Sequence, residues 1–142
     1  MNIDLRQIGI VKSLNDKREG IIEIFPQYLE GLEGIENFSH IILLAWLHKV
    51  SEEQRNTLKV KPMRIQDLPN VGVFCTHSPH RPNPIALSIV RLTERKNNLL
   101  YVQNLDLFEE TPILDIKTVS PSFCPKDIKV PEWNKELEKY KK

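Results

Sequence analysis

Residues 71–88 read VGVFCTHSPHRPNPIALS, a polar and proline-rich stretch between two apolar runs. Pro79, Pro82 and Pro84 each fix φ and remove a backbone donor. The residues before them are pushed toward extended conformations, which excludes a helix and the middle of a sheet. The stretch therefore predicts a stiff loop that leaves one strand and enters another. Such a loop holds its polar side chains at little cost in entropy, which suits a functional site.

Short apolar segments rich in β-branched residues surround this loop and are separated by glycine, proline and polar turns. The expected strands are residues 8–11, 21–24, 40–48, 71–74, 85–93, 99–102 and 113–116. Residues 96–98 predict a hairpin turn, and residues 133–142 predict a short polar helix. Many short strands at close spacing predict one all-β domain over residues 1–142, either a barrel or a sandwich.

Composition and charge are those of an ordinary globular protein. The chain has 142 residues, 40% of them hydrophobic and 27% charged, which is enough for one domain with a real core. The formal net charge of +1 does not by itself indicate a nucleic-acid-binding protein, although a local basic patch would suffice for one.

Nothing in the sequence indicates secretion or membrane insertion. Two cysteines, Cys75 and Cys124, are too few for a disulfide scaffold. Asp4 and Arg6 stand where a signal peptide would need an unbroken apolar core. The longest apolar run, residues 41–47, is far too short to cross a bilayer. We therefore expect a soluble cytoplasmic protein with reduced thiols and no membrane contact.

Three possible zinc ligands, Cys75, His77 and His80, lie in or beside the proline-rich loop. If the strand continued to His77, Cys75 and His77 would share a face, and with His80 they would leave a fourth position for water. No Cys or His pair at matched spacing lies elsewhere, and a cysteine beside Phe74 is more often a small buried apolar residue. We therefore predict no metal.

Ser78, Arg81 and Asn83 each precede a proline and are candidates for positioning a substrate. The planar guanidinium of Arg81 suits a carboxylate or a phosphate, and an internal acid would satisfy it equally well. The amide of Asn83 more often caps the backbone of its own loop.

A basic strip precedes the loop and consists of Lys59, Lys61 and Arg64, with Arg55 upstream. Strand-like alternation would put Lys59 and Lys61 on one face, where they could meet a phosphate backbone. On charge alone, a solvated surface is the more common interpretation of such a strip.

Two acids and two histidines stand beside apolar runs. Asp106 and Asp115 each lie between apolar residues, so each is either hydrogen-bonded to backbone or available as a base. His40 and His48 bracket an apolar strand, where a histidine satisfied at the edge of the core is the default expectation.

Several of these segments resemble the motifs of one known protein family, in the same order along the chain. GVFCTHSPHRPNPIALS closely resembles GVFATRSPxRPNPIGLS, a signature of the TsaA-like family of TrmO-type tRNA methyltransferases. LEGLEGIENFSHIILLAWLH resembles that family's GLExFSHLWVLFxFH, VKPMR its VRPPR, and NLDLFEETPILDIK its LDLLDGTPVLDIKPY. The similarity runs from about Ile8 to Pro121, which is most of the chain.

The resemblance implies a β-barrel and a homodimer that uses S-adenosylmethionine. Its implied substrate is tRNA carrying N6-threonylcarbamoyladenosine at position 37, which would be methylated on N6. A base would help, because the lone pair of that nitrogen is delocalised. Asp106 and Glu109 are the candidates for this base by position, together with His77. Lys59, Lys61 and Arg64 would then hold the tRNA backbone.

The family's cofactor contacts map onto matching positions of this chain. They are His48, Lys49, His77, Leu87, Gln103, Asn104, Leu105 and Asp106.

The chain also departs from the family pattern. His77 replaces the loop arginine, Ala86 replaces a glycine, and Glu109–Glu110 stand where the family has Asp-Gly. The family's PRQ-type segment, which helps to hold the cofactor, has no clear match in residues 13–20. These departures keep two alternatives open: a non-catalytic RNA-binding barrel, and a small zinc hydrolase built on the possible zinc ligands.

Overall fold

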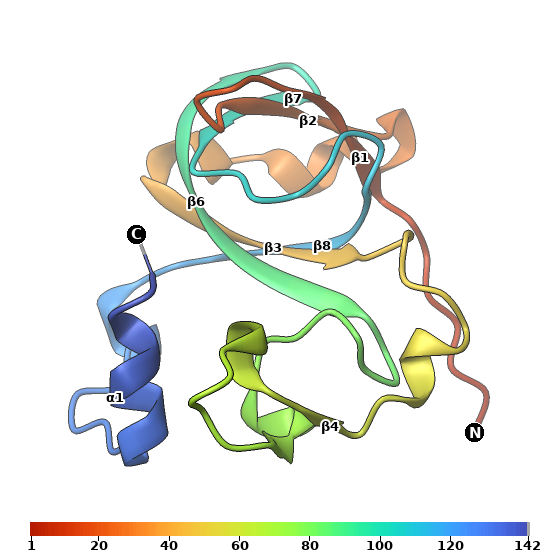
Figure 1. The fold of residues 1–142 in the computed structure, drawn as a ribbon. Coiled ribbons are helices and arrows are strands. Elements are labelled where there is room, and N and C mark those ends of the chain that lie inside the picture. Colours follow the sequence, from red (N-terminus) through yellow and green to blue (C-terminus); the bar gives the residue numbers. More distant parts are fainter. Residues whose placement is uncertain (142) are drawn as a thin grey trace. The chain divides into compact units, whose positions relative to one another are not determined.

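The computed structural model describes residues 1–141, and its regular elements are mostly antiparallel β-strands and short 3-10 helices (Figure 1). The chain divides into two compact units. The first unit comprises Met1–His48 and Ile85–Pro121, and the second comprises Lys49–Pro84 and Ser122–Lys142. Residues 49–84 are therefore an insertion between two strands of the first unit.

The first unit is a closed antiparallel barrel with the strand order β1-β2-β7-β6-β3-β8, visible as a ring in Figure 1. The ring closes where Gly9 of β1 pairs with Ile113 of β8. A closed ring leaves no unpaired sheet edge. The strands are β1 (Gly9–Leu14), β2 (Gly20–Ile24), β3 (His40–Trp46), β6 (Ile85–Lys96), β7 (Leu99–Gln103) and β8 (Pro112–Thr118).

Alternating side chains fill the barrel. In β6, Ser88, Val90 and Leu92 are buried, whereas Leu87 and Ile89 on either side of Ser88 are each 51% exposed. The N-terminal part of β6 pairs with β3 and its C-terminal part with β7, and the register of the β6–β7 pair shifts between Leu92 and Glu94. Such a bulge lets one long strand bend around a small barrel.

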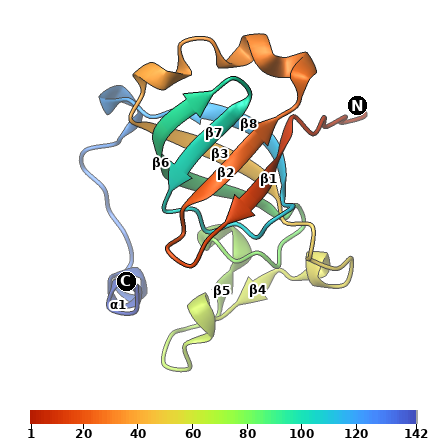
Figure 2. The same ribbon diagram turned by 90° about the horizontal axis from the view of Figure 1, so that it is seen from above.

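Two 3-10 helices, η1 (Pro26–Leu32) and η2 (Ile35–Asn37), lie across one end of the barrel (Figure 2). Their residues Leu32 and Ile35 are buried in the same apolar cluster as the strands. Gly34, with a φ of 87°, joins the two helices in a conformation that favours glycine. This end of the barrel is therefore closed by apolar packing.

The second unit has little regular structure. Strands β4 (Lys59–Val60) and β5 (Val71–Gly72) form a two-stranded sheet. The 3-10 helices η3 (Gln54–Asn56), η4 (Pro62–Arg64), η5 (Val73–Cys75) and η6 (Pro121–Phe123) and the α-helix α1 (Glu132–Glu138) complete the list of elements. Of these, η6 begins in the first unit.

Most of the strand predictions are confirmed, as is the all-β barrel with a short C-terminal helix. The predicted strand over residues 71–74 is wrong in its second half, because β5 ends at Gly72 and η5 follows it. The predicted helix over residues 133–142 is shorter, and Lys142 lies outside the described residues. The prediction of a single domain over residues 1–142 stays a prediction.

Candidate functional site

The proline-rich loop is tied together by its own polar side chains. The guanidinium of Arg81 donates from Nη1 to the carbonyl oxygens of Thr76 at 2.9 Å and Ser78 at 3.2 Å. The hydroxyl of Ser78 accepts from the backbone N–H of His80 at 3.3 Å. Arg81 and Ser78, both predicted to position a substrate, therefore hold the loop in its shape.

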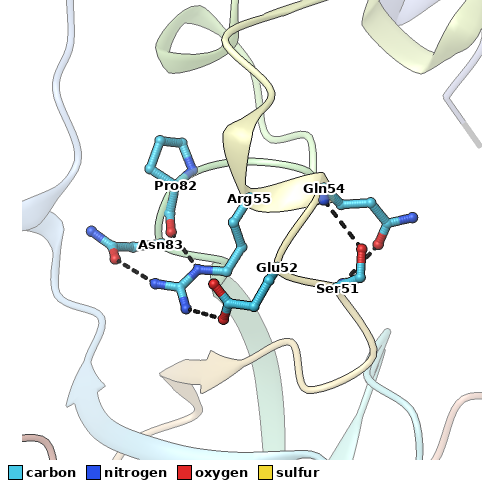
Figure 3. Close-up of polar contacts among 6 residues, drawn as sticks. All are labelled: Ser51, Glu52, Gln54, Arg55, Pro82 and Asn83. Atoms are coloured by element: carbon cyan, nitrogen blue, oxygen red, sulfur yellow. Dashed lines mark hydrogen bonds and ion pairs between the residues drawn. The ribbon is translucent and has the colours of Figure 1, made fainter.

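A second arginine holds the far end of the loop (Figure 3). Arg55 donates from Nε to the carbonyl of Pro82 at 2.7 Å and from Nη2 to Oδ1 of Asn83 at 3.4 Å. Its Nη1 also pairs with Glu52 at 2.9 Å. Asn83 thus contacts an arginine from another segment, whereas we expected it to cap its own loop. Sequence reasoning placed Arg55 only upstream of the basic strip, since 27 residues separate it from Pro82.

The inner side of this loop borders a cavity of about 730 Å³ that lies wholly within the second unit. Three basic side chains, Lys61, Arg64 and Lys141, line it together with His77 and His80. No aspartate or glutamate is among the lining residues. The lining therefore carries a positive charge that suits an anion.

The turn that carries Arg64 has an unusual backbone. Met63 and Arg64 have φ values of 50° and 59°, and the turn closes through Arg64 N–H to the carbonyl of Lys61 at 2.9 Å. For residues other than glycine, the left-handed region costs about 1–2 kcal/mol each. Two such residues in succession indicate a backbone shaped to aim their side chains, as at many functional sites. Lys61 is engaged at its tip, since Nζ donates to the carbonyl of Leu68 at 3.2 Å.

The barrel holds the segment predicted to meet the cofactor just after β7. Leu105 is fully buried, and its N–H donates to the carbonyl of Arg18 at 2.9 Å. Asn104, with a φ of 64°, makes the turn that reverses the chain before this anchor. The exposed Asp106 accepts a short hydrogen bond, 2.6 Å long, from the hydroxyl of Ser88 on β6. The carboxylate is therefore held in one orientation.

Glu109, the other candidate base, is also engaged. Its Oε1 accepts from the N–H of Leu14 at the end of β1 at 3.1 Å. The neighbouring Thr111 is buried and donates from its hydroxyl to the carbonyl of Phe108 at 2.6 Å. Glu109 thus links the loop before β8 to the end of β1. Its other carboxylate oxygen, Oε2, takes no part in this hydrogen bond.

The other predicted cofactor residues divide between the units. His48 is exposed in the turn that follows β3, and Leu87 stands on the outer face of β6. Gln103 ends β7. Lys49 and His77 belong to the second unit, where both are exposed.

The geometry assumed for a zinc site is wrong. It required a strand through His77, but residues 73–75 form a 3-10 helix and the strand ends earlier, at Gly72. Within residues 1–141, no group of three or more His, Cys, Asp or Glu side chains is arranged to hold a metal ion. No helix in this described part is long and apolar enough to span a membrane.

Residues 6–124 match the model of a protein family described as "tRNA-methyltransferase O N-terminal domain". The chain belongs to this family. A Pyrococcus abyssi relative named "Probable S-adenosyl-L-methionine-binding protein" is 42% identical over 83% of this chain and 61% of its own length. An Archaeoglobus fulgidus relative named "S-adenosyl-L-methionine-binding protein" is 43% identical over 82% of this chain and 89% of its own.

A solved structure extends the similarity to the fold. The crystal structure of TrmO from Pseudomonas aeruginosa superposes with a TM-score of 0.66 and 31% identity. The match covers 86% of this chain and 58% of the crystallised one. The chain thus spans less than two thirds of that protein and of the P. abyssi relative. The predicted family resemblance is confirmed, and the names of the relatives agree with the predicted cofactor.

Three residues were missed by sequence reasoning. Ser88 was detectable, because it is a polar residue at an inward position of an alternating strand. The role of Arg55 was not detectable, because its partners lie on a distant loop. Trp133 was assigned only to a polar helix, yet it lines the cavity of the second unit.

Proposed function

We propose that this protein is an S-adenosylmethionine-dependent tRNA methyltransferase that methylates N6 of N6-threonylcarbamoyladenosine at position 37. The observation that carries the proposal is membership of the tRNA-methyltransferase O family over residues 6–124. The proline-rich loop that resembles the family signature is, in addition, built as a fixed scaffold by Arg55 and Arg81. Methyl transfer depends largely on positioning, and a fixed loop supports that.

In this proposal the cofactor supplies a methyl group on a positively charged sulfur. The barrel presents Leu87 on an exposed outer face of β6 and the anchored segment after β7. The resemblance assigns cofactor contacts to His48, Leu87, Gln103, Asn104, Leu105 and Asp106 in the barrel unit, and to Lys49 and His77 in the second unit.

The proton on N6 must leave as the new N–C bond forms, and we assign it to Asp106. The hydroxyl of Ser88 occupies Oδ1 of this carboxylate, so Oδ2 is left to accept a proton in a fixed direction. Glu109 is the second candidate, and its contact with Leu14 gives it a structural task as well. The variants Asp106→Asn and Glu109→Gln separate the two, because only loss of the base should lower turnover by about 100-fold or more.

Lys59, Lys61 and Arg64 would position the tRNA through its phosphates, which brings affinity without sequence information. The resemblance further implies a homodimer, and we propose that in such a dimer one subunit's basic strip serves the other's pocket. Light scattering tests this: a monomeric particle with full activity would contradict it. A cytoplasmic location goes with the same function and stays a prediction.

A second candidate function is an RNA-binding barrel without catalysis. It is favoured by the short turn where the family has its PRQ-type segment. Asn15 closes this turn by accepting at Oδ1 from the N–H groups of Lys17 and Glu19, both at 2.9 Å. A turn so tightly closed offers no extra segment to hold the cofactor.

Methyl transfer to tRNA tests the two functions directly. The protein is incubated with S-adenosylmethionine and tRNA, and the nucleosides of the digested tRNA are then analysed. We expect one added methyl group on N6-threonylcarbamoyladenosine, and none on tRNA that lacks the threonylcarbamoyl group. Binding of tRNA with no methyl transfer and no cofactor binding would favour the second function.

A further inference from the structure

The cavity of the second unit combines features that the proposed function does not yet use. Besides its basic lining it has one aromatic wall, Trp133 of α1, which is partly buried. Leu137, one turn further along α1, is 8% exposed and also lines the cavity. The match to the family model ends at residue 124, before α1 begins.

Arg64 is the free cation of this cavity. It is exposed, and within residues 1–141 no side chain pairs with its guanidinium. Lys141 forms an ion pair with Glu138 at 3.0 Å, and Lys61 donates to a backbone carbonyl. The consecutive left-handed residues Met63 and Arg64 both line the cavity, and a planar guanidinium suits a phosphate.

We propose that this cavity binds one unstacked nucleotide of an RNA single strand, with the base against Trp133 and its phosphate at Arg64. This inference rests on the proposed function, whose tRNA substrate carries single-stranded loops. Bases in such loops can be splayed out and stacked on aromatic side chains. The volume of about 730 Å³ lies within the roughly 300–1,000 Å³ of small-ligand sites.

The charge of the lining argues for RNA over the cofactor. S-adenosylmethionine carries two positive groups and one carboxylate, so a lining with Lys61, Arg64 and Lys141 and no acid repels it overall. A nucleotide phosphate has the opposite sign. His77, assigned by the resemblance to the cofactor, also lines this cavity, so the test must include the cofactor alone.

The fluorescence of Trp133 reports directly on this site. The chain has two tryptophans, so Trp46→Phe leaves Trp133 as the only one. In that background we titrate an anticodon stem-loop RNA and expect saturable quenching, since a stacked base quenches tryptophan. A fully paired RNA of the same length should quench little at equal concentration.

Binding variants separate stacking, charge and packing. Trp133→Leu keeps an apolar side chain without a ring and should weaken RNA binding about 5-fold or more, whereas Trp133→Phe should weaken it less. Arg64→Ala should weaken RNA binding about 10-fold. It should also reduce the slope of the logarithm of the binding constant against the logarithm of salt concentration by about 1, the value for one lost phosphate contact. The control Lys129→Ala removes an exposed cation of the same unit that does not line the cavity, and should bind as the wild type does.

The inference is overturned if RNA leaves Trp133 emission unchanged, or if Trp133→Leu or Arg64→Ala binds RNA like the wild type. Saturable quenching by S-adenosylmethionine alone would overturn it too, because the cavity would then take the cofactor. Methyl transfer measured in parallel keeps the two proposals apart. Transfer without quenching contradicts only this inference, and quenching without transfer contradicts only the proposed function.

Discussion

The barrel buries fifteen apolar residues in one continuous cluster, whereas the second unit buries Leu68, Val73 and Leu137 and holds its loop with arginine side chains. The closed sheet and the continuous core make the barrel a rigid frame. Short 3-10 turns joined by polar contacts allow the second unit to present many backbone and side-chain groups to a ligand. In our proposal most cofactor contacts and the base Asp106 belong to the barrel, and the residues that hold the RNA belong to the second unit.

The largest expected effect is on the barrel core. Leu43 is fully buried on β3, so Leu43→Ala should lower the free energy of unfolding by about 2–5 kcal/mol. Ile89→Ala, on the half-exposed outer face of β6, is the matched control and should cost under about 1 kcal/mol. Urea denaturation measures both. Equal losses would contradict the assignment of inner and outer faces.

Gly20→Ala should have the second-largest effect on stability, because Gly20 begins β2 at a point where another segment approaches closely. A Cβ here would meet the side chain of Leu105 and lie 2.8 Å from the carbonyl oxygen of Ser13. We expect a loss of about 1–3 kcal/mol in the free energy of unfolding. Because Leu105 would have to move, cofactor binding should weaken as well. Gly31→Ala, where a Cβ would meet nothing within 4 Å, is the control.

Arg55→Met should affect the second unit and spare the barrel. It removes the hydrogen bonds to Pro82 and Asn83 and the ion pair with Glu52 while keeping an unbranched side-chain stem. Since Arg55 is partly exposed, we expect a local loss of about 1–2 kcal/mol. Hydrogen exchange should then accelerate in residues 76–83 and stay unchanged in β3. Faster exchange throughout the barrel would show that the two regions are not distinct in stability.

The smallest effect is a pH dependence within the barrel unit. A backbone hydrogen bond to Glu36, and then the hydrogen bond and charge of Arg95, lower the pKa of this carboxyl from its ordinary value of 4.5. A lowered pKa stabilises the fold above that ordinary value, and the gain is lost as pH falls through the lowered pKa. Glu36→Gln should therefore flatten the acid limb of stability slightly. An unchanged acid limb would contradict this contribution.

The barrel was easier to predict than the site. Residues 85–93 alternate between apolar and polar side chains, and this period of two is that of a strand with one buried face. The β-branched runs elsewhere identify the other strands. The end of β5 at Gly72 was not predictable, since η5 is stabilised by a tertiary contact, the N–H of Val73 to the carbonyl of Leu58 at 2.9 Å.

Within the site, the proline positions predicted a stiff loop, and its residues are indeed fixed. The means by which they are fixed was not predictable, because Arg55 lies 27 residues before Pro82 and no local pattern joins them. The same holds for Ser88 and Asp106, which are 18 residues apart. Trp133 joins the cavity only through tertiary packing of α1.

Titration calorimetry of S-adenosylmethionine tests the central claim most directly. We expect saturable binding to the wild type, loss of binding in Leu87→Arg on the barrel, and unchanged binding in Arg64→Ala of the second unit. The absence of binding at millimolar cofactor, with tRNA present as well, would contradict the account. Equal loss in both variants would contradict the division of labour between the barrel and the second unit.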